Sequence, residues 1–589
     1  MKFPLSLGLI LTACLGFSGS AQAAPPNVLV LLADDAGWGD YGASGNRQIA
    51  TPHIDSLARD GASMERFFVC PVCSPTRAEF LTGRYYERTG VRGVSSGQER
   101  LDLGEKTIAD AFKAAGYATG AFGKWHNGSQ WPYHPQARGF QEYFGYTSGH
   151  WGEYFDAPLE ENGRLVPTQG YIVDVCTDRA LDFIDRNKDR PFFCYVPFTT
   201  PHSPWAVPDG YWERFKDKPV SQRGMEQSEV QLNTTRCALA MLENQDWNVG
   251  RLLDRLRKHG LEQNTIVVYF SDNGPNSPRW NGGMKGIKGS TDEGGVRSLC
   301  HVRYPAKIRR GKTVHGISGA IDLLPTLTAL AGIPRVGDLP LDGRDISPTL
   351  AGQGDVLPDR TLFSVWGQKV SVRTARHRLD AKGNLYDPEK DPGQTQPLNA
   401  SEPAWVEKLA SAREAWRQEI QSLHAAPGAR PFPVGYREFP VTLLPARDGI
   451  PQGEVQRSSK HPNSSFFQNW TRLEDRIVWN VDIHTAGTYS FSLDYTCAEK
   501  DAGATVEISL GSATLQARVT PAWDPPLRTL QQDTLPRGIH GESPMKEFRT
   551  LHAGTMHLEK GPGALTLRAT LIPGEKVMDL RRVTLTLLP

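Results

Sequence analysis

Asn27 to Ala33 reads NVLVLLA, an unbroken apolar and β-branched run that stops at Asp34-Asp35. Such a run is typical of a strand that is covered on both faces in a parallel sheet. Two later segments repeat the design, FFCYVPF at Phe192–Phe198 and TIVVYF at Thr265–Phe270. Polar residues follow each run, so we expect the chemistry to lie at the carboxyl ends of these strands.

Apolar residues at helical spacing lie between the predicted strands, for example around residues 108–115 and 180–184. Strands that alternate with helices predict an α/β domain, which we place at residues 27–345. In an open α/β sheet, ligands bind outside the carboxyl ends of the strands.

The rest of the chain has a different pattern. Residues 346–435 combine a short strand-like region, the turn-rich LYDPEKDP at Leu385–Pro392 and a predicted helix at Trp405–Ile420, which together indicate a small α+β lobe. A loop rich in Pro and Gly, residues 425–453, marks a boundary. Beyond it, strict alternation predicts an antiparallel β-sandwich at residues 454–589, either a carbohydrate-binding module or a brace for the catalytic domain. The alternating residues are Tyr489, Phe491, Leu493 and Tyr495, then Val506, Ile508 and Leu510, then Val583, Leu585 and Leu587.

Charge and composition exclude several classes of protein. The 589 residues include 66 Lys and Arg against 65 Asp and Glu, so no overall field favours nucleic acid or an anionic membrane. Hydrophobic residues make up 39% of the chain, as in ordinary globular proteins. After the first residues, no stretch approaches the roughly 20 apolar residues of a membrane span. We therefore expect no nucleic-acid partner and no transmembrane segment.

The amino terminus predicts export. Lys2 precedes an apolar run, Phe3–Leu15, and Ala21-Gln22-Ala23 fits a signal-peptidase site, so residues 1–23 are interpreted as a signal peptide. The expected location is the periplasm or the extracellular space. An alternative is a lipoprotein anchored through Cys14, because Leu11-Thr12-Ala13-Cys14 is similar to a lipobox. Cleavage leaves an odd number of cysteines, so at least one must be unpaired.

The segment CPVCSPTR begins at Cys70 and contains the sharpest local motif. By spacing alone, Cys70 and Cys73 form a C-x-x-C pair, as in redox motifs and half zinc sites. No second C-x-x-C accompanies it, and Pro75 does not fit a thioredoxin-like helix start. The spacing also allows Cys70 and Cys73 to form a disulfide or to be buried free cysteines.

The chain resembles the type I sulfatases of the alkaline phosphatase superfamily, particularly bacterial polysaccharide sulfatases. In that family C-x-P-x-R followed by T-G-R directs oxidation of the cysteine to formylglycine, and here these motifs are Cys73-Ser74-Pro75-Thr76-Arg77 and Thr82-Gly83-Arg84. Further matches follow in order: Asp34-Asp35, Gly123-Lys124-Trp125-His126, Pro201-His202, Ser271-Asp272-Asn273-Gly274, Lys288 and Glu293-Gly294-Gly295-Val296-Arg297. The resemblance covers about residues 27–420. It implies an alkaline-phosphatase-like fold, with a central mixed sheet between helices, and a maturation enzyme, either formylglycine-generating or anaerobic.

Oxygen ligands at strand ends predict a metal site. Asp34, Asp35 and Asp272 supply carboxylates and Asn273 an amide oxygen, a set suited to a hard cation. The resemblance implies one calcium ion, with oxidised Cys73 as a further ligand. Magnesium stays open, because oxygen ligands alone do not separate the two ions.

The resemblance also implies catalytic roles. The hydrated aldehyde from Cys73 is the expected nucleophile, with Arg77 holding its hydroxyl. His126 is the expected base that triggers release of sulfate, and His202 the acid that protonates the leaving alcohol. The expected ligands of the sulfate oxygens are Lys124 and Lys288.

Substrate contacts are less sharply indicated. Six residues lie near strand ends or between motifs and are candidates for the substrate subsites: Ser148, His150, Trp205, Asn276, Arg279 and Trp280. A sulfated polysaccharide or oligosaccharide is the expected substrate. Alternatives are a small aryl sulfate ester, a phosphodiester or phosphonate handled on the same scaffold, and a catalytically inactive binding protein.

Overall fold

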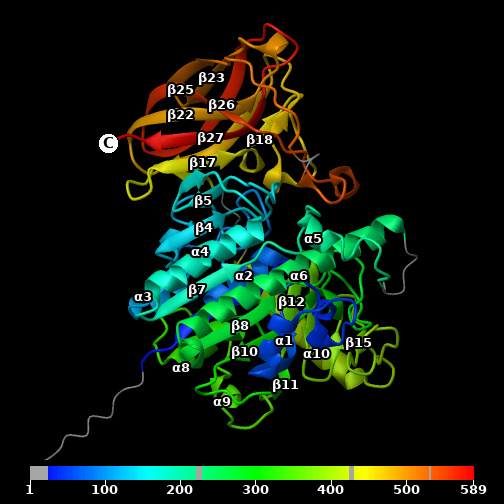
Figure 1. Ribbon diagram of the computed structural model, residues 1–589. Coiled ribbons are helices and arrows are strands. Elements are labelled where there is room, and N and C mark those ends of the chain that lie inside the picture. Colours follow the sequence, from blue (N-terminus) through cyan, green and yellow to red (C-terminus); the bar gives the residue numbers. More distant parts are fainter. Residues whose placement is uncertain (1–23, 221–227, 424–429, 529–531) are drawn as a thin grey trace, which may run out of the picture.

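The structure is a computed structural model that describes residues 24–220, 228–423, 430–528 and 532–589 (Figure 1). The expected signal peptide and the lipobox at Cys14 lie outside these residues. Within the described ranges, no helix is long and apolar enough to cross a membrane.

The predicted strands form the centre of a large mixed sheet. Its five central strands run parallel in the order β8-β1-β7-β3-β4. They are β8 (Thr265–Ser271), β1 (Asn27–Ala33), β7 (Phe192–Pro197), β3 (Ala118–Lys124) and β4 (Glu142–Tyr146). Because these strands are parallel, their carboxyl ends lie at one edge of the sheet, and the loops that follow them lie together.

The sheet is extended on both sides. Beyond β8 lie antiparallel β10 (Cys300–Arg303), then β2 (Ala62–Phe68) with the short β9 (Arg297–Ser298) and β11 (Lys312–Gly319). Antiparallel β5 (Leu159–Glu161) and β6 (Arg164–Val166) follow β4. These antiparallel edges make the sheet mixed, as expected.

Helices cover both faces of the sheet because β1 is apolar on both sides. Leu29 and Leu31 pack in one core with α4 (Ile172–Asn187), α6 (Glu229–Lys258) and α1 (Pro52–Arg59). Val28, Val30 and Leu32 pack in the other core. The helices on that second face are α2 (Cys73–Thr82), α3 (Ile108–Ala114) and α8 (Leu323–Ala331). Alternate side chains of a strand point to opposite faces, so an unbroken apolar run requires two covering layers.

A small lobe follows the catalytic domain, as expected. A four-stranded antiparallel sheet is formed by β12 (Leu362–Trp366), β13 (Lys369–Arg373), β14 (Arg378–Leu379) and β15 (Leu385–Tyr386). The predicted helix is α10 (Pro403–Leu423), which packs against β13.

The C-terminal domain consists of two six-stranded sheets, β16-β21-β26-β23-β24 with β18, and β19-β20-β27-β22-β25 with β17. Its first strands, β16 (Phe432–Val434), β17 (Val441–Pro445) and β18 (Ile450–Gln452), precede the boundary expected at residue 454. These strands are short and lie in a segment rich in Pro and Gly, so the alternation of apolar residues did not predict them. The remaining strands are β19 (Gln456–Arg457), β20 (Phe467–Gln468), β21 (Arg476–Ile483), β22 (Gly487–Thr496), β23 (Thr505–Leu510), β24 (Ala513–Arg518), β25 (Arg549–Leu558), β26 (Gly561–Leu571) and β27 (Asp579–Leu587).

The C-terminal domain lies over one end of the catalytic sheet. Figure 1 shows it above β4 and β5. Gln130 of the catalytic domain donates to the carbonyl of Leu443 in β17 at 2.9 Å and to the carboxylate of Asp448 at 3.1 Å. The C-terminal domain is therefore placed where it reaches the loops after β4 and β7.

Candidate active site

The polar residues predicted at strand ends meet at one place. Asp34 and Asp35 follow β1, Asp272 and Asn273 follow β8, and Lys124 ends β3. The backbone ties the two acidic loops together, because the N–H of Asp35 donates to Asp272 Oδ1 at 3.1 Å. All five residues are almost fully buried.

Cys73 is the first residue of α2 and faces this cluster. Its sulfur lies within 4.8 Å of carboxylate oxygens of Asp34 and Asp272. The positive end of the helix dipole favours negative charge at this position. Burial nevertheless raises the pKa of the Cys73 thiol, so the unmodified side chain is a poor thiolate nucleophile. All seven described cysteines are free, Cys70 included, which excludes a Cys70–Cys73 disulfide here.

Two lysines neutralise part of the acidic cluster. Lys124 Nζ donates to Asp34 Oδ2 at 2.7 Å, and Lys288 Nζ lies 2.7 and 2.8 Å from the two carboxylate oxygens of Asp35. Although burial opposes its charge, the Asp35 carboxylate holds the pKa of Lys288 above its ordinary value. Both lysines therefore lie beside Cys73.

The donor set fits a hard cation. Asp34 Oδ1 and Asn273 Oδ1 are buried and have no hydrogen-bond partner among the described residues. Burial, and then the neighbouring Asp34 carboxylate, raises the pKa of Asp272 to about 6. Buried, unpartnered oxygens and crowded carboxylates both cost free energy that a bound cation would recover. Asp34, Asp35, Asp272 and Asn273 therefore suit calcium or magnesium.

Arg77 lies behind the cluster and is fully buried. Its Nε and Nη2 donate to Asp272 Oδ2 at 3.2 and 2.8 Å, and Nη1 donates to the carbonyl of Lys124 at 2.8 Å. The structure thus places this guanidinium against a predicted metal ligand and the end of β3, where it orients both.

His126 has one free ring nitrogen. Its Nε2 lies 2.8 Å from the carbonyl of Val94, while Nδ1 is buried without a partner among the described residues. Burial, and then the charge of Lys124, lowers the pKa of His126 well below its ordinary value. The Val94 carbonyl requires the proton on Nε2, so neutral His126 presents a lone pair at Nδ1, as a base must.

His202 and His150 form a pair at the other side of the site. Their Nδ1 atoms are 3.2 Å apart, and His202 Nε2 lies 3.6 Å from Asp35 Oδ2. Burial, and then Lys288, lowers the pKa of His202 well below its ordinary value. A proton on this imidazole is therefore readily given up.

Several of these groups line a pocket of about 390 Å³. Of the six expected substrate residues, His150, Trp205 and Asn276 line it. The whole lining is Asp35, Val72, Cys73, Val94, His126, Gly149, His150, His202, Ser203, Trp205, Asn276, Lys288, His461, Asn463 and Glu542.

The other three expected substrate residues lie outside the pocket. Ser148 is buried and donates to the carbonyl of His150. Arg279 is 2% exposed and binds the Asp40 carboxylate at 2.7 to 3.0 Å. Trp280 packs against Trp38, with ring centroids 6.4 Å apart. Arg279 and Trp280 thus support the loop after β8.

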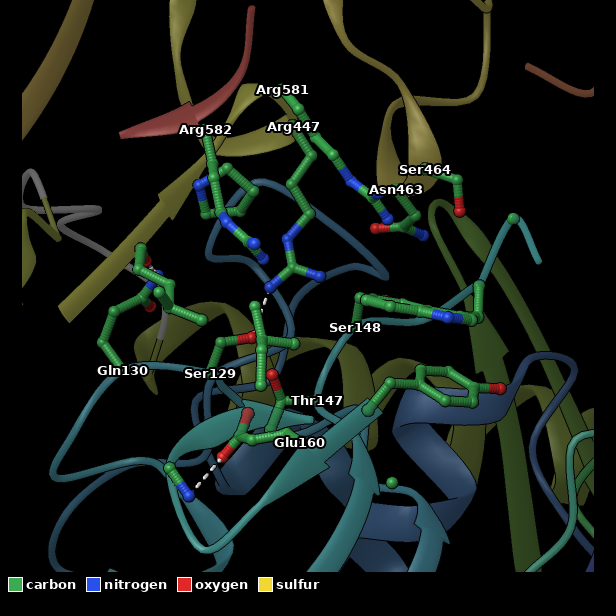
Figure 2. Close-up of a pocket in the computed structure, with 18 of the residues that line it drawn as sticks. Ser129, Gln130, Thr147, Ser148, Glu160, Arg447, Asn463, Ser464, Arg581 and Arg582 are labelled. Atoms are coloured by element: carbon green, nitrogen blue, oxygen red, sulfur yellow. Dashed lines mark hydrogen bonds between the residues drawn. The ribbon is translucent and has the colours of Figure 1, made fainter. Parts of the chain in front are cut away.

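Sequence reasoning missed His461, Asn463 and Glu542, which reach the pocket from the C-terminal domain. His461 and Asn463 lie at the short 3-10 helix Pro462–Ser464 and Glu542 in an irregular segment, and no motif or periodicity marks them. A second cavity, of about 90 Å³, adjoins the pocket and shares Asn463 with it. Figure 2 shows Arg447, Arg581 and Arg582 of the C-terminal domain extending into this cavity. The two domains thus enclose it together.

Comparison with known proteins agrees with this geometry. The family model described as Sulfatase matches residues 26–333. The N-acetylgalactosamine-6-sulfatase of Canis lupus familiaris is 32% identical over 406 residues, which are 62% of this chain and 73% of that protein. Arylsulfatase A of Homo sapiens is 33% identical over 404 residues, 62% of this chain and 74% of that protein.

Solved structures share the fold. The crystal structure of Ps i-CgsB in complex with k-i-k-neocarrahexaose is 27% identical with a TM-score of 0.60, over 68% of this chain and 98% of that chain. The phosphonate monoester hydrolase of Agrobacterium radiobacter, 21% identical with a TM-score of 0.53 over 69% of this chain and 99% of that chain, is similar in fold alone. With a family model matched over more than half of its length, the chain belongs to the sulfatase family of the alkaline phosphatase superfamily and is a sulfatase.

Proposed function

We propose that this sulfatase removes sulfate from a sulfated glycan, using formylglycine made from Cys73 and one calcium ion. The observation that carries the proposal is the convergence of Cys73, an oxygen-rich acidic cluster, two lysines and two histidines at one pocket, which Cys73, Asp35, Lys288, His126 and His202 line. A sulfate ester is an anion and repels a negatively charged nucleophile, so the site must offset that repulsion. It must also stabilise the negative charge that develops on the departing oxygen.

The residues proposed to hold calcium are Asp34, Asp35, Asp272 and Asn273, together with oxidised Cys73. When present, the hydrated aldehyde would supply a hydroxyl as nucleophile. The cation would lower the pKa of that hydroxyl and supply positive charge that balances the sulfate. Magnesium is the alternative cation, because the donor set alone does not distinguish them.

The remaining roles follow from charge and position. The ammonium groups of Lys124 and Lys288 lie beside Cys73, where they can bind sulfate oxygens and offset charge in the transition state. Neutral His126 accepts the proton whose loss expels sulfate and restores the aldehyde, and His202 protonates the leaving oxygen. Arg77 acts through the Asp272 carboxylate that it binds.

The glycan substrate is proposed from the shape of the site and from relatives. The pocket and the adjoining cavity between the domains leave room for groups next to the sulfate. One relative is named N-acetylgalactosamine-6-sulfatase, and a similar structure holds a neocarrahexaose. Trp205 and Asn276, which line the pocket, are proposed sugar contacts. Export to the periplasm or outside the cell, and maturation by a formylglycine-forming enzyme, belong to the same proposal.

The test requires protein from a host that makes formylglycine. Mass spectrometry of the peptide around Cys73 should show the aldehyde, and sulfate release should be measured over a panel of sulfated glycans and 4-nitrophenyl sulfate. Cys73→Ser should lose turnover while folding normally. Full turnover by that variant would refute the mechanism. Faster hydrolysis of 4-nitrophenyl phosphate than of the sulfate would overturn the proposed ester class.

A further inference from the structure

A segment of the C-terminal domain reaches from the β-sandwich onto the catalytic loops. This segment, residues 532–548, lies between β24 and β25, and in Figure 1 it belongs to the orange loop that descends toward α5 (Asp209–Trp212). The backbone N–H groups of Thr534 and Leu535 both donate to the carbonyl of Trp205 at 3.0 Å. Thr534 Oγ1 also accepts from the N–H of Val207 at 3.0 Å. The segment is therefore fixed beside the loop that follows β7.

This segment places one carboxylate in the active site. Glu542 Oε2 lies 2.6 Å from His150 Nε2, and Glu542 Oε1 accepts from Ser203 Oγ at 2.6 Å. Both the glutamate and the histidine side chains are 8% exposed. A carboxylate of the C-terminal domain is thus buried against a histidine of the catalytic domain.

These contacts decide which nitrogens carry protons. The Glu542 carboxylate lies 2.6 Å from His150 Nε2 as an ion-pair contact rather than an aligned hydrogen bond, and because a carboxylate oxygen can only accept, we assign a proton to Nε2. The other ring nitrogen of His150, Nδ1, lies 3.2 Å from His202 Nδ1. His202 must carry its proton at Nδ1, which also lies 2.7 Å from the carbonyl of Ser203. The remaining nitrogen of His202, Nε2, is left facing Asp35 and the pocket.

We propose that Glu542 is a positioning residue for the sulfatase reaction, which fixes His150 and through it directs Nε2 of His202 at the leaving oxygen of the ester. The inference rests on the acid role of His202 in the proposed function. For that step His202 is the imidazolium, which carries a second proton, taken from solvent, at Nε2. This proton passes to the ester oxygen as the bond from that oxygen to sulfur breaks, and the product leaves as the alcohol. His202 remains as the Nδ1-protonated tautomer that His150 and Ser203 stabilise.

The arrangement makes the C-terminal domain part of the active site. The sulfatase family model ends at residue 333, well before Glu542. A carboxylate that holds the far side of a functional histidine fixes its tautomer and orientation, and removing such a partner typically costs about 10- to 100-fold in activity at metal sites. We expect an effect of that size here.

The experiment compares leaving groups, because only a poor leaving group needs protonation. Rates are measured for wild type, Glu542→Ala, Glu542→Gln and His150→Ala with 4-nitrophenyl sulfate and unsubstituted phenyl sulfate, per formylglycine-containing site. Glu547→Ala is the matched control, since Glu547 lies in the same segment, is exposed and lies 3.9 Å from Arg528. Thermal melts establish that each variant is folded.

We expect Glu542→Ala to lower kcat on phenyl sulfate by about 10- to 100-fold, but on 4-nitrophenyl sulfate by less than about threefold. Glu542→Gln should recover most of the rate, because its amide oxygen can still accept from His150. His150→Ala should show the same selective loss, and adding Glu542→Ala to it should cost little more. Equal losses on both esters, or no loss, would overturn the inference. Inactivity of the wild type on both esters and on the glycan panel would instead overturn the proposed function.

Discussion

Replacement of Arg77 by Met tests whether its guanidinium compensates the buried acidic cluster. The variant loses the hydrogen bonds at 2.8 and 3.2 Å to Asp272 and the one at 2.8 Å to the carbonyl of Lys124. Removing one partner of a buried ion pair costs about 3–5 kcal/mol, because the other charge is left uncompensated. For a domain of this size, that loss corresponds to a fall in Tm of roughly 10 °C.

Calcium separates this explanation from a simple loss of packing. A cation bound beside Asp272 would replace part of the missing positive charge, so the stability deficit of Arg77→Met should shrink when calcium replaces EGTA. The assay is calorimetry of protein made without maturation, so that every chain carries the same Cys73. Arg360→Met is the control, since Arg360 binds buried Asp322 at 2.7 Å outside the cluster, and its deficit should not respond to calcium. The reasoning fails if Arg77→Met has the same Tm as the wild type. It also fails if calcium reduces the stability deficits of Arg77→Met and Arg360→Met equally.

Three further predictions concern the metal, the base and stability. Asn273→Ala removes an unpartnered buried amide oxygen, so calorimetric titration should show weaker calcium binding, by about tenfold or more; unchanged affinity would remove Asn273 from the ligand set. His126→Ala lacks the neutral imidazole proposed to expel sulfate, so rapid mixing with 4-nitrophenyl sulfate should give a burst of about one nitrophenol per site before slow turnover; a slow, burst-free reaction would contradict this role. Burial raises the pKa of Glu87 from 4.5 to about 8. Because the folded state holds this proton more tightly than the unfolded chain, stability should be highest below pH 4.5 as far as this group is concerned. It should fall as pH rises toward 8, by up to about 5 kcal/mol, and Glu87→Gln should flatten that dependence in denaturant titrations.

The sequence was most informative where local pattern and chemistry coincide. The runs at residues 27–33, 192–198 and 265–270 are strands of the central sheet within a residue of their expected ends. Their unbroken apolar character required two covering layers, and both helical layers are present. Since parallel strands end at one edge, the polar residues after β1, β3, β7 and β8 had to lie near one another. The formylglycine motif added Cys73, and the family resemblance is confirmed.

The substrate side of the site was less predictable. Arg279 follows a strand as Asp272 does, yet it turns inward to Asp40. Ser148 and His150 are two residues apart, but only His150 lines the pocket. Loop conformation decides such outcomes, and no periodicity in the sequence records it.

The sequence by itself therefore determined the central sheet, the order of domains and the acidic, basic and cysteine groups at the strand ends, because repeating apolar patterns and strand direction are local properties. Only the tertiary structure decided that Arg77 lies behind Asp272 and that Glu542 reaches His150. The reason is that Glu542 is 392 residues from His150 in the chain and lies in an irregular segment. Its place depends on how two separately folded cores pack, a contact between surfaces that neither core's pattern encodes.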